Sequence, residues 1–106
     1  MVTIEDFRKI ELRTAEILSA TAHPQADKLL VLQIRVGEEE RTIVAGIRAH
    51  YQESELVGKK IVVVTNLEPA VIRGVTSEGM LLAASHDGAL AVLVPDREIP
   101  SGAKVK

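Results

Sequence analysis

Short runs of strand-forming residues, separated by turn residues, most constrain what this chain folds into. In residues 29–36 every second side chain from Leu30 to Val36 is apolar, while Gln33 and Arg35 fall on the opposite face. Such alternation is typical of a strand with one buried face. Similar patterns predict further strands at residues 12–22, 41–47, 61–67, 80–84 and 89–94. Periodicity by itself therefore indicates a small β-barrel.

Two short helical turns interrupt these strands. The first starts at Thr3, which is suited to cap a helix N-terminus and is followed by acidic residues. The second covers residues 52–57 and ends at Gly58. Three strands, a short helix and then further strands is the element order of an OB-fold. We therefore expect an all-β protein, an OB-fold five-stranded Greek-key barrel with short helices and terminal extensions.

Length and composition indicate one intracellular domain. The chain has 106 residues, which gives a single domain, residues 1–106, with one core. It contains no cysteine, which excludes disulfides and thiolate metal sites and fits a reducing cytoplasm. Its apolar runs are far too short to span a bilayer, and Glu5 and Asp6 stand where a signal peptide would be basic and then apolar. We expect a cytoplasmic protein with no membrane partner.

Charge and aromatic content limit the kind of nucleic acid that this chain would bind. Thirteen basic and fifteen acidic residues give a net charge of −2, whereas nucleic-acid-binding domains are usually basic. A local basic face is compatible with this balance, but few phosphate contacts are expected. Phe7 and Tyr51 are the only aromatic residues, too few for the stacking platforms of nonspecific single-strand binders. The composition favours recognition of a folded nucleic acid by its shape and backbone.

A polar loop between two apolar strands is the first candidate binding site. It follows the strand at residues 61–64 and ends where the next strand begins, at Met80. Small β-barrels often place binding groups on such loops. The alternative is a hairpin loop in which the glycines only permit turns. The polar and turn-forming residues of this loop are Asn66, Pro69, Arg73, Gly74, Ser77 and Gly79.

A second candidate is the loop at residues 23–28, between the first two strands, where OB-folds often bind ligands. The preceding strand ends near His23 because Pro24 has no N–H to donate. Lys28 offers a compact positive charge suited to a phosphate. Asp27 either orients Lys28 or caps the turn. The alternative for Lys28 is a solvated surface charge.

The two loops together resemble a known family. The sequences at residues 23–29, His-Pro-Gln-Ala-Asp-Lys-Leu, and at residues 77–80, Ser-Glu-Gly-Met, are similar to the tRNA-binding module appended to bacterial and archaeal methionyl-tRNA synthetases. That module also occurs as a free dimeric tRNA-binding protein and in cytokine-like synthetase cofactors. The resemblance covers nearly the whole chain, residues 4–102, and supports the OB-fold more strongly than element order does.

The resemblance implies a set of tRNA-contact positions. Asn66 has donors and an acceptor that suit a base edge or ribose hydroxyl, or else the loop's own backbone. Met80 is otherwise a core filler. Arg73 is added on chemistry, because its guanidinium stands beside Gly74 in the same loop. The candidate tRNA-binding residues are Lys28, Asn66, Arg73, Ser77 and Met80. Further basic candidates, for which a solvated surface role is favoured, are Arg13, Arg35, Arg41 and Arg48.

No motif supports an enzymatic function. The three histidines lie in separate loops without metal-ligand spacing, and Ser77 and Ser85 lack the context of a catalytic nucleophile. We expect no cofactor and no metal. The resemblance implies an accessory module that captures folded tRNA without catalysis, as a homodimer and with an aminoacyl-tRNA synthetase as a further partner. Apolar residues available for the dimer contact are Ile4, Phe7, Ile99 and Val105.

The main alternative is a peptide-binding export chaperone of the same fold, a branch that resembles this chain in length and in its dimer. That branch departs from the sequence at residues 26–30, which is intact here. Intact sequences at residues 26–30 and 77–80 favour tRNA. The chain begins at Met1 and ends where the family's domain ends, so we expect a stand-alone gene product.

Overall fold

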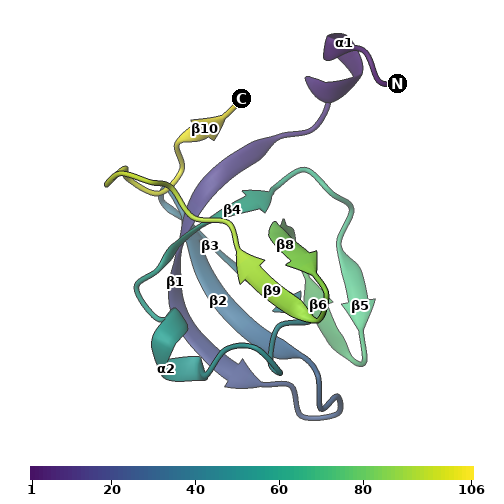
Figure 1. Ribbon diagram of the computed structural model, residues 1–106, viewed down its shortest axis with the longest axis vertical. Coiled ribbons are helices and arrows are strands. Elements are labelled where there is room, and N and C mark those ends of the chain that lie inside the picture. Colours follow the sequence, from purple (N-terminus) through teal and green to yellow (C-terminus); the bar gives the residue numbers. More distant parts are fainter.

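The computed structural model describes residues 1–106, and most of its regular structure is β-strand (Figure 1). No helix has the length and apolar character needed to cross a lipid bilayer. The elements in chain order are α1 (Ile4–Phe7), β1 (Leu12–Ala22), β2 (Leu30–Val36), β3 (Glu39–Ala45), α2 (Glu53–Leu56), β4 (Lys60–Val64), β5 (Ala70–Ile72), β6 (Val75–Ser77), β7 (Met80–Leu81), β8 (Ala83–His86), β9 (Ala89–Val92) and β10 (Lys104–Val105).

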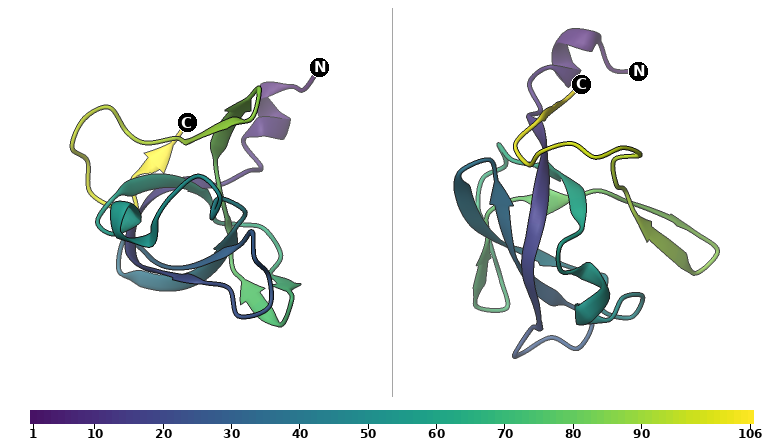
Figure 2. Two further views of the ribbon diagram at one scale, coloured as in Figure 1. Left: turned by 60° about the horizontal axis from the view of Figure 1, so that its bottom comes forward. Right: turned by 90° about the vertical axis from the view of Figure 1, so that its left-hand side faces the viewer.

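Five antiparallel strands form the main sheet in the order β3-β2-β1-β4-β7, and β10 pairs with β1 outside this path. The sheet curls around one side of the molecule as a half-barrel, which is clearest in the left view of Figure 2. α2 connects β3 to β4 and lies at one end of the barrel (Figure 1). The expected fold class, an all-β OB-type barrel with short helices, is confirmed.

The curvature of the sheet is set along β1, which is eleven residues long. Residues 12–16 of β1 pair with β4, and its second half pairs with β2 on the other edge. The β1–β2 register shifts between Ile17 and Ser19, so that Leu18 is an extra residue on β1. Such a bulge bends its strand and increases the twist, which helps one long strand to serve two partners.

The core lies inside the curled sheet and contains thirteen buried residues. Leu30, Leu32 and Ile34 of β2 are fully buried, whereas Gln33 and Arg35 are exposed, which confirms the predicted alternation. Leu56 of α2 is also fully buried in this cluster. Burial of each such side chain contributes about 1.5–3 kcal/mol. The core therefore supplies a rigid support for the loops at the barrel ends.

The C-terminal segment is tied to β1 by Thr14. The Thr14 hydroxyl donates to the carbonyl oxygen of Pro100 at 2.8 Å and accepts from the N–H of Ala103 at 2.9 Å. Gly102 lies so close to Gly37 that a Cβ on it would stand 2.7 Å from the Gly37 Cα, and its φ is +86°. A residue without a side chain is required at this crossing. These contacts explain β10, a strand that the sequence does not predict.

The strands expected at residues 41–47, 61–67 and 89–94 are instead Glu39–Ala45, Lys60–Val64 and Ala89–Val92, and two further segments differ in kind from the expectation. The polar loop after β4 contains a hairpin formed by β5 and β6. The strand expected at residues 80–84 is divided at Leu82, whose N–H bonds the carbonyl of Val62 and whose carbonyl accepts from Leu93. The chain leaves the main sheet there and enters the β8–β9 hairpin. Strands of two or three residues are too short to show a period in the sequence.

Candidate nucleic-acid interface

The first loop, residues 23–28, connects β1 to β2 at one end of the barrel (Figure 1). Backbone hydrogen bonds hold it in a compact turn, from the N–H of His23 to the carbonyl of Leu29 at 3.1 Å and from the N–H of Leu29 to the carbonyl of Ala26 at 3.3 Å. Lys28 is exposed on this turn. Its ammonium group takes part in none of the ion pairs of the protein.

The β5–β6 hairpin presents Arg73 at its tip. Ile72 pairs with Val75, which leaves Arg73 and Gly74 as a two-residue turn. Both turn residues have positive φ, 51° and 88°. This backbone matches the twist of the two strands, and glycine at the second position adopts it without steric cost. Arg73 is exposed, and its guanidinium pairs with no carboxylate.

The tip of the β5–β6 hairpin lies beside the first loop. The Nε2 of His23 is 2.9 Å from the carbonyl oxygen of Ile72, the residue before Arg73. Both views in Figure 2 show the loop after β1 next to the hairpin. Lys28 and Arg73, which are far apart in the sequence, therefore belong to neighbouring segments at the same end of the barrel.

The four further arginine candidates have partners within the protein. Three of them form ion pairs, Arg13 with Glu11, Arg35 with Glu16 and Arg41 with Glu39. The fourth, Arg48, donates to the carbonyl of Asp27 at 3.1 Å and so braces the first loop. Lys28 and Arg73 are thus the two candidate cations without an internal partner.

Ser77 fixes the base of the β5–β6 hairpin. Its side chain is buried, and its hydroxyl donates to the carbonyl of Gly79 at 3.0 Å and accepts from the N–H of Val44 at 2.9 Å. The adjacent N–H of Glu78 bonds the carbonyl of Thr42 at 2.8 Å. The hydroxyl expected to face tRNA is therefore engaged between β3 and the hairpin.

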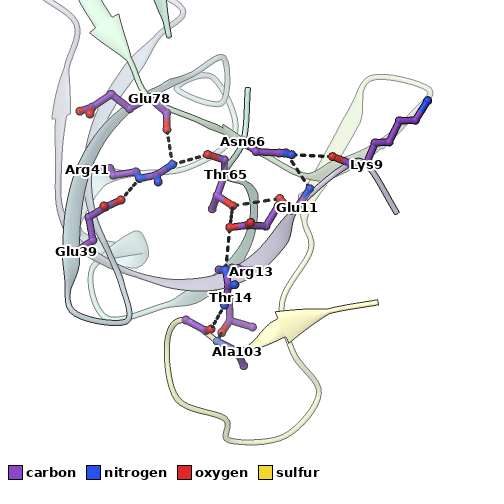
Figure 3. Close-up of polar contacts among 11 residues, drawn as sticks. Lys9, Glu11, Arg13, Thr14, Glu39, Arg41, Thr65, Asn66, Glu78 and Ala103 are labelled. Atoms are coloured by element: carbon purple, nitrogen blue, oxygen red, sulfur yellow. Dashed lines mark hydrogen bonds and ion pairs between the residues drawn. The ribbon is translucent and has the colours of Figure 1, made fainter. Parts of the chain in front are cut away.

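Asn66 lies two residues after the end of β4 and holds the segment between α1 and β1 (Figure 3). Its Nδ2 donates to the carbonyl of Lys9 at 2.7 Å, and its Oδ1 accepts from the N–H of Glu11 at 2.8 Å. These are bonds to backbone, although to a distant segment and not to its own loop. One N–H and one lone pair of the amide remain for a ligand.

A polar network joins Glu11, Thr65 and Arg41 at the end of the barrel where β1 begins, whereas the first loop lies where β1 ends (Figure 3). The Glu11 carboxylate accepts from Arg13 Nε at 2.9 Å and from the Thr65 hydroxyl at 2.9 Å. These two hydrogen bonds, that of Arg13 above all, hold the pKa of Glu11 below its ordinary value of 4.5. Arg41 donates to the carbonyls of Thr65 at 2.6 Å and of Glu78 at 3.2 Å, and so links the end of β4 to the hairpin base.

Met80, the last candidate, begins β7 opposite Val64 and is 49% exposed. It is therefore a surface residue and not a core filler. An apolar groove lies beside it, lined by side chains that include Val44, Ile47, Leu82 and Leu90. The thioether is available to a partner on this face.

Comparison with known proteins identifies the family. Residues 12–104 match the family described as "Putative tRNA binding domain". The chain belongs to this family. It is also 50% identical over 104 residues to a methionine–tRNA ligase of Caldanaerobacter subterraneus subsp. tengcongensis, a match that covers 98% of this chain and 16% of the ligase. The chain thus spans about a sixth of the length of that relative.

Two solved structures share the fold of the domain over its whole length. A MetRS related protein from Pyrococcus horikoshii superimposes with a TM-score of 0.94 at 36% sequence identity, covering 100% of this chain and 98% of that one. The chaperone CsaA from Bacillus anthracis str. Ames superimposes with a TM-score of 0.90 at 30% identity, covering 100% and 99%. The family resemblance inferred from the two loops is confirmed.

Two residues that hold the candidate interface together are not recognised from the sequence. His23 is assigned no role in binding there, and its place beside Pro24 in the loop motif is the only local signal. Arg41 carries no signal, because its carbonyl partners lie 24 and 37 residues away along the chain.

Proposed function

We propose that the domain is a structure-specific tRNA-binding module that captures folded tRNA without catalysing a reaction. One observation carries the proposal: in a member of the tRNA-binding domain family, two neighbouring loops each present an unpaired cation, Lys28 and Arg73, at the same barrel end. Unpaired cations at a fixed spacing suit a phosphate backbone. By holding tRNA, the domain raises the local concentration of tRNA for a synthetase. We propose that it acts in the cytoplasm.

Each candidate residue has a proposed role. Lys28 and Arg73 contact phosphates, and Met80 contacts the RNA through its exposed thioether. Asn66 offers its remaining N–H and lone pair while it holds the segment before β1. Ser77, which is buried, contributes by fixing the hairpin that carries Arg73.

Competition among three RNAs tests this function. Folded tRNA, denatured tRNA and poly-U compete for the protein at one salt concentration. Folded tRNA should bind most tightly, because the domain lacks the aromatic residues on which unfolded bases stack. Equal affinity for all three would contradict recognition of a folded structure.

A second candidate function is peptide binding by a chaperone. It is favoured by the likeness to the chaperone CsaA and by the apolar groove beside Met80. Filter binding of labelled tRNA and of an unfolded client peptide to the same preparation separates the two functions. Binding of the peptide alone would replace tRNA capture with the chaperone function.

We propose further that the domain forms a homodimer and works beside an aminoacyl-tRNA synthetase. The support for a dimer is α1, where the apolar side chains of Ile4 and Phe7 lie on one helical turn and are both exposed. The support for a synthetase partner is the identity to part of a methionine–tRNA ligase.

A further inference from the structure

We propose that His23 is a positioning residue that holds the tip of the β5–β6 hairpin against the first loop. In doing so it fixes the spacing between Lys28 and Arg73. The inference rests on the proposed function, since this spacing matters when both cations meet one RNA backbone. His23 is only 4% exposed, so it is part of the protein's interior and not a contact for RNA.

Both ring nitrogens of His23 have partners. Nδ1 accepts a hydrogen bond from the backbone N–H of Gln25 at 3.0 Å. A carbonyl oxygen only accepts, so Nε2, 2.9 Å from the carbonyl oxygen of Ile72, carries the proton and donates it. The ring is therefore in its neutral Nε2–H tautomer. One nitrogen is bonded within the first loop and the other to the hairpin.

The β5–β6 hairpin has few other attachments. It forms a two-stranded sheet of its own, an arrangement that is marginally stable without support. Its base is held on β3 through Ser77 and Glu78. Toward the tip, the bond from His23 to Ile72 is the one hydrogen bond that joins residues 70–76 to the rest of the protein. Without it no hydrogen bond holds the tip, and we expect Arg73 to lose its fixed position.

Two substitutions separate the two hydrogen bonds of His23. In His23→Asn the amide oxygen takes the place of Nδ1, but the shorter side chain does not reach Ile72. In His23→Gln the amide nitrogen takes the place of Nε2, while the acceptor for the N–H of Gln25 is lost. His23→Asn therefore breaks the contact with the hairpin and keeps the turn, and His23→Gln does the reverse.

Amide hydrogen exchange in the RNA-free protein is the first measurement. Exchange of the hairpin amides should accelerate on the order of tenfold in His23→Asn, as for the loss of one hydrogen bond. In His23→Gln it should stay close to that of wild type. Exchange of the β2 amides is the internal control and should change in neither variant. A role in general stability would instead move β2 and the hairpin together.

Binding of tRNA against salt concentration is the second measurement, with Arg73→Ala made in each background. In wild type and in His23→Gln, Arg73→Ala should lower the slope of log K against log salt by roughly 0.7–0.9, the loss of one phosphate contact. In His23→Asn the same substitution should lower the slope by less than half of that. The effects of the two changes are then non-additive, as coupling requires.

Two outcomes would overturn the proposal. Hairpin exchange in His23→Asn equal to that of wild type would overturn it, and so would ¹⁵N spectra that show the Nδ1–H tautomer in the wild-type ring. If His23→Asn does not fold, the wild-type ring spectrum and His23→Gln carry the decision. If the exchange results hold but the wild-type protein binds no tRNA, the proposed function fails while the contact between His23 and the hairpin stands.

Discussion

At the scale of single residues, the polar groups of the candidate site fall into two kinds. Lys28 and Arg73 are exposed without a carboxylate partner, so their charges are available to a phosphate. Ser77 and Asn66 instead bond backbone groups of distant segments. Removal of the Lys28 or Arg73 side chain should weaken tRNA binding. Removal of the Ser77 or Asn66 side chain should first lower the stability of the fold.

Replacing Lys28 by Ala should weaken tRNA binding without unfolding the barrel. If Lys28 neutralises one phosphate, the slope of log K against log salt should fall by roughly 0.7–0.9. The measurement is the binding constant at several salt concentrations. Lys106→Ala, which removes an exposed lysine at the C-terminus, is the matched control. A Lys28→Ala protein with wild-type affinity and slope would remove Lys28 from the site.

Glu11 should make stability depend on pH in the acid range. Its folded-state pKa is lowered by Arg13 and Thr65, so it contributes stability above its ordinary pKa of 4.5. That contribution is lost as the pH falls through the lowered pKa. The Tm of wild type and Glu11→Gln is compared from roughly pH 6 to pH 3. The two Tm values should differ at the upper end of this pH range and converge at its lower end. A difference that stays constant over the range would contradict the lowered pKa of Glu11.

At the scale of elements, the β5–β6 hairpin depends on its neighbours for its position. Its base is attached to β3 by Ser77 and Glu78, and Arg41 of β3 bonds the carbonyls on either side of the hairpin. The hairpin therefore moves with the barrel and not as an independent arm. Anything that frees the base should loosen the cation at the tip.

Replacing Ser77 by Ala should destabilise the protein by about 1–3 kcal/mol, because it leaves the N–H of Val44 without its acceptor in a buried place. Urea unfolding measures this change. Ser85→Ala, at an exposed position on β8, is the control and should stay within about 0.5 kcal/mol of wild type. Equal effects of the two substitutions would show that the Ser77 hydroxyl bonds contribute nothing.

At the scale of the whole molecule, the barrel and the N-terminal segment differ in burial. The core strands contain fully buried residues, whereas α1 buries none. α1 projects from the barrel beside the C-terminal end of the chain (Figure 1). A helical turn that exposes Ile4 and Phe7 and buries no residue in its own chain is a natural place for a second copy to bind.

The protein should sediment as a dimer at micromolar concentration. Phe7→Asp should shift the equilibrium toward monomer, because a charge would be buried in the proposed contact. Val71→Asp, at an exposed apolar residue on β5 away from α1, is the control and should leave the dimer intact. A wild-type protein that sediments as a monomer would defeat the dimer proposal.

The sequence by itself determined the parts of this protein that depend on local pattern. Alternation along residues 29–36 predicted the buried face of β2, and Thr3 predicted the start of α1. The two loop motifs predicted the family, because each motif is an unbroken run of residues that can be read in the sequence. The element order indicated the OB-type barrel.

Only the tertiary structure decided how those parts meet. β10 pairs with β1 because Thr14 and Gly102 bring distant segments together, and no period marks a two-residue strand. Ser77 and Asn66 are engaged within the protein, and His23 joins two loops, through partners that lie 33, 55 and 49 residues away along the chain. Hydrogen bonds over such separations leave no pattern in a single sequence, since their geometry exists only after the barrel has closed around its core.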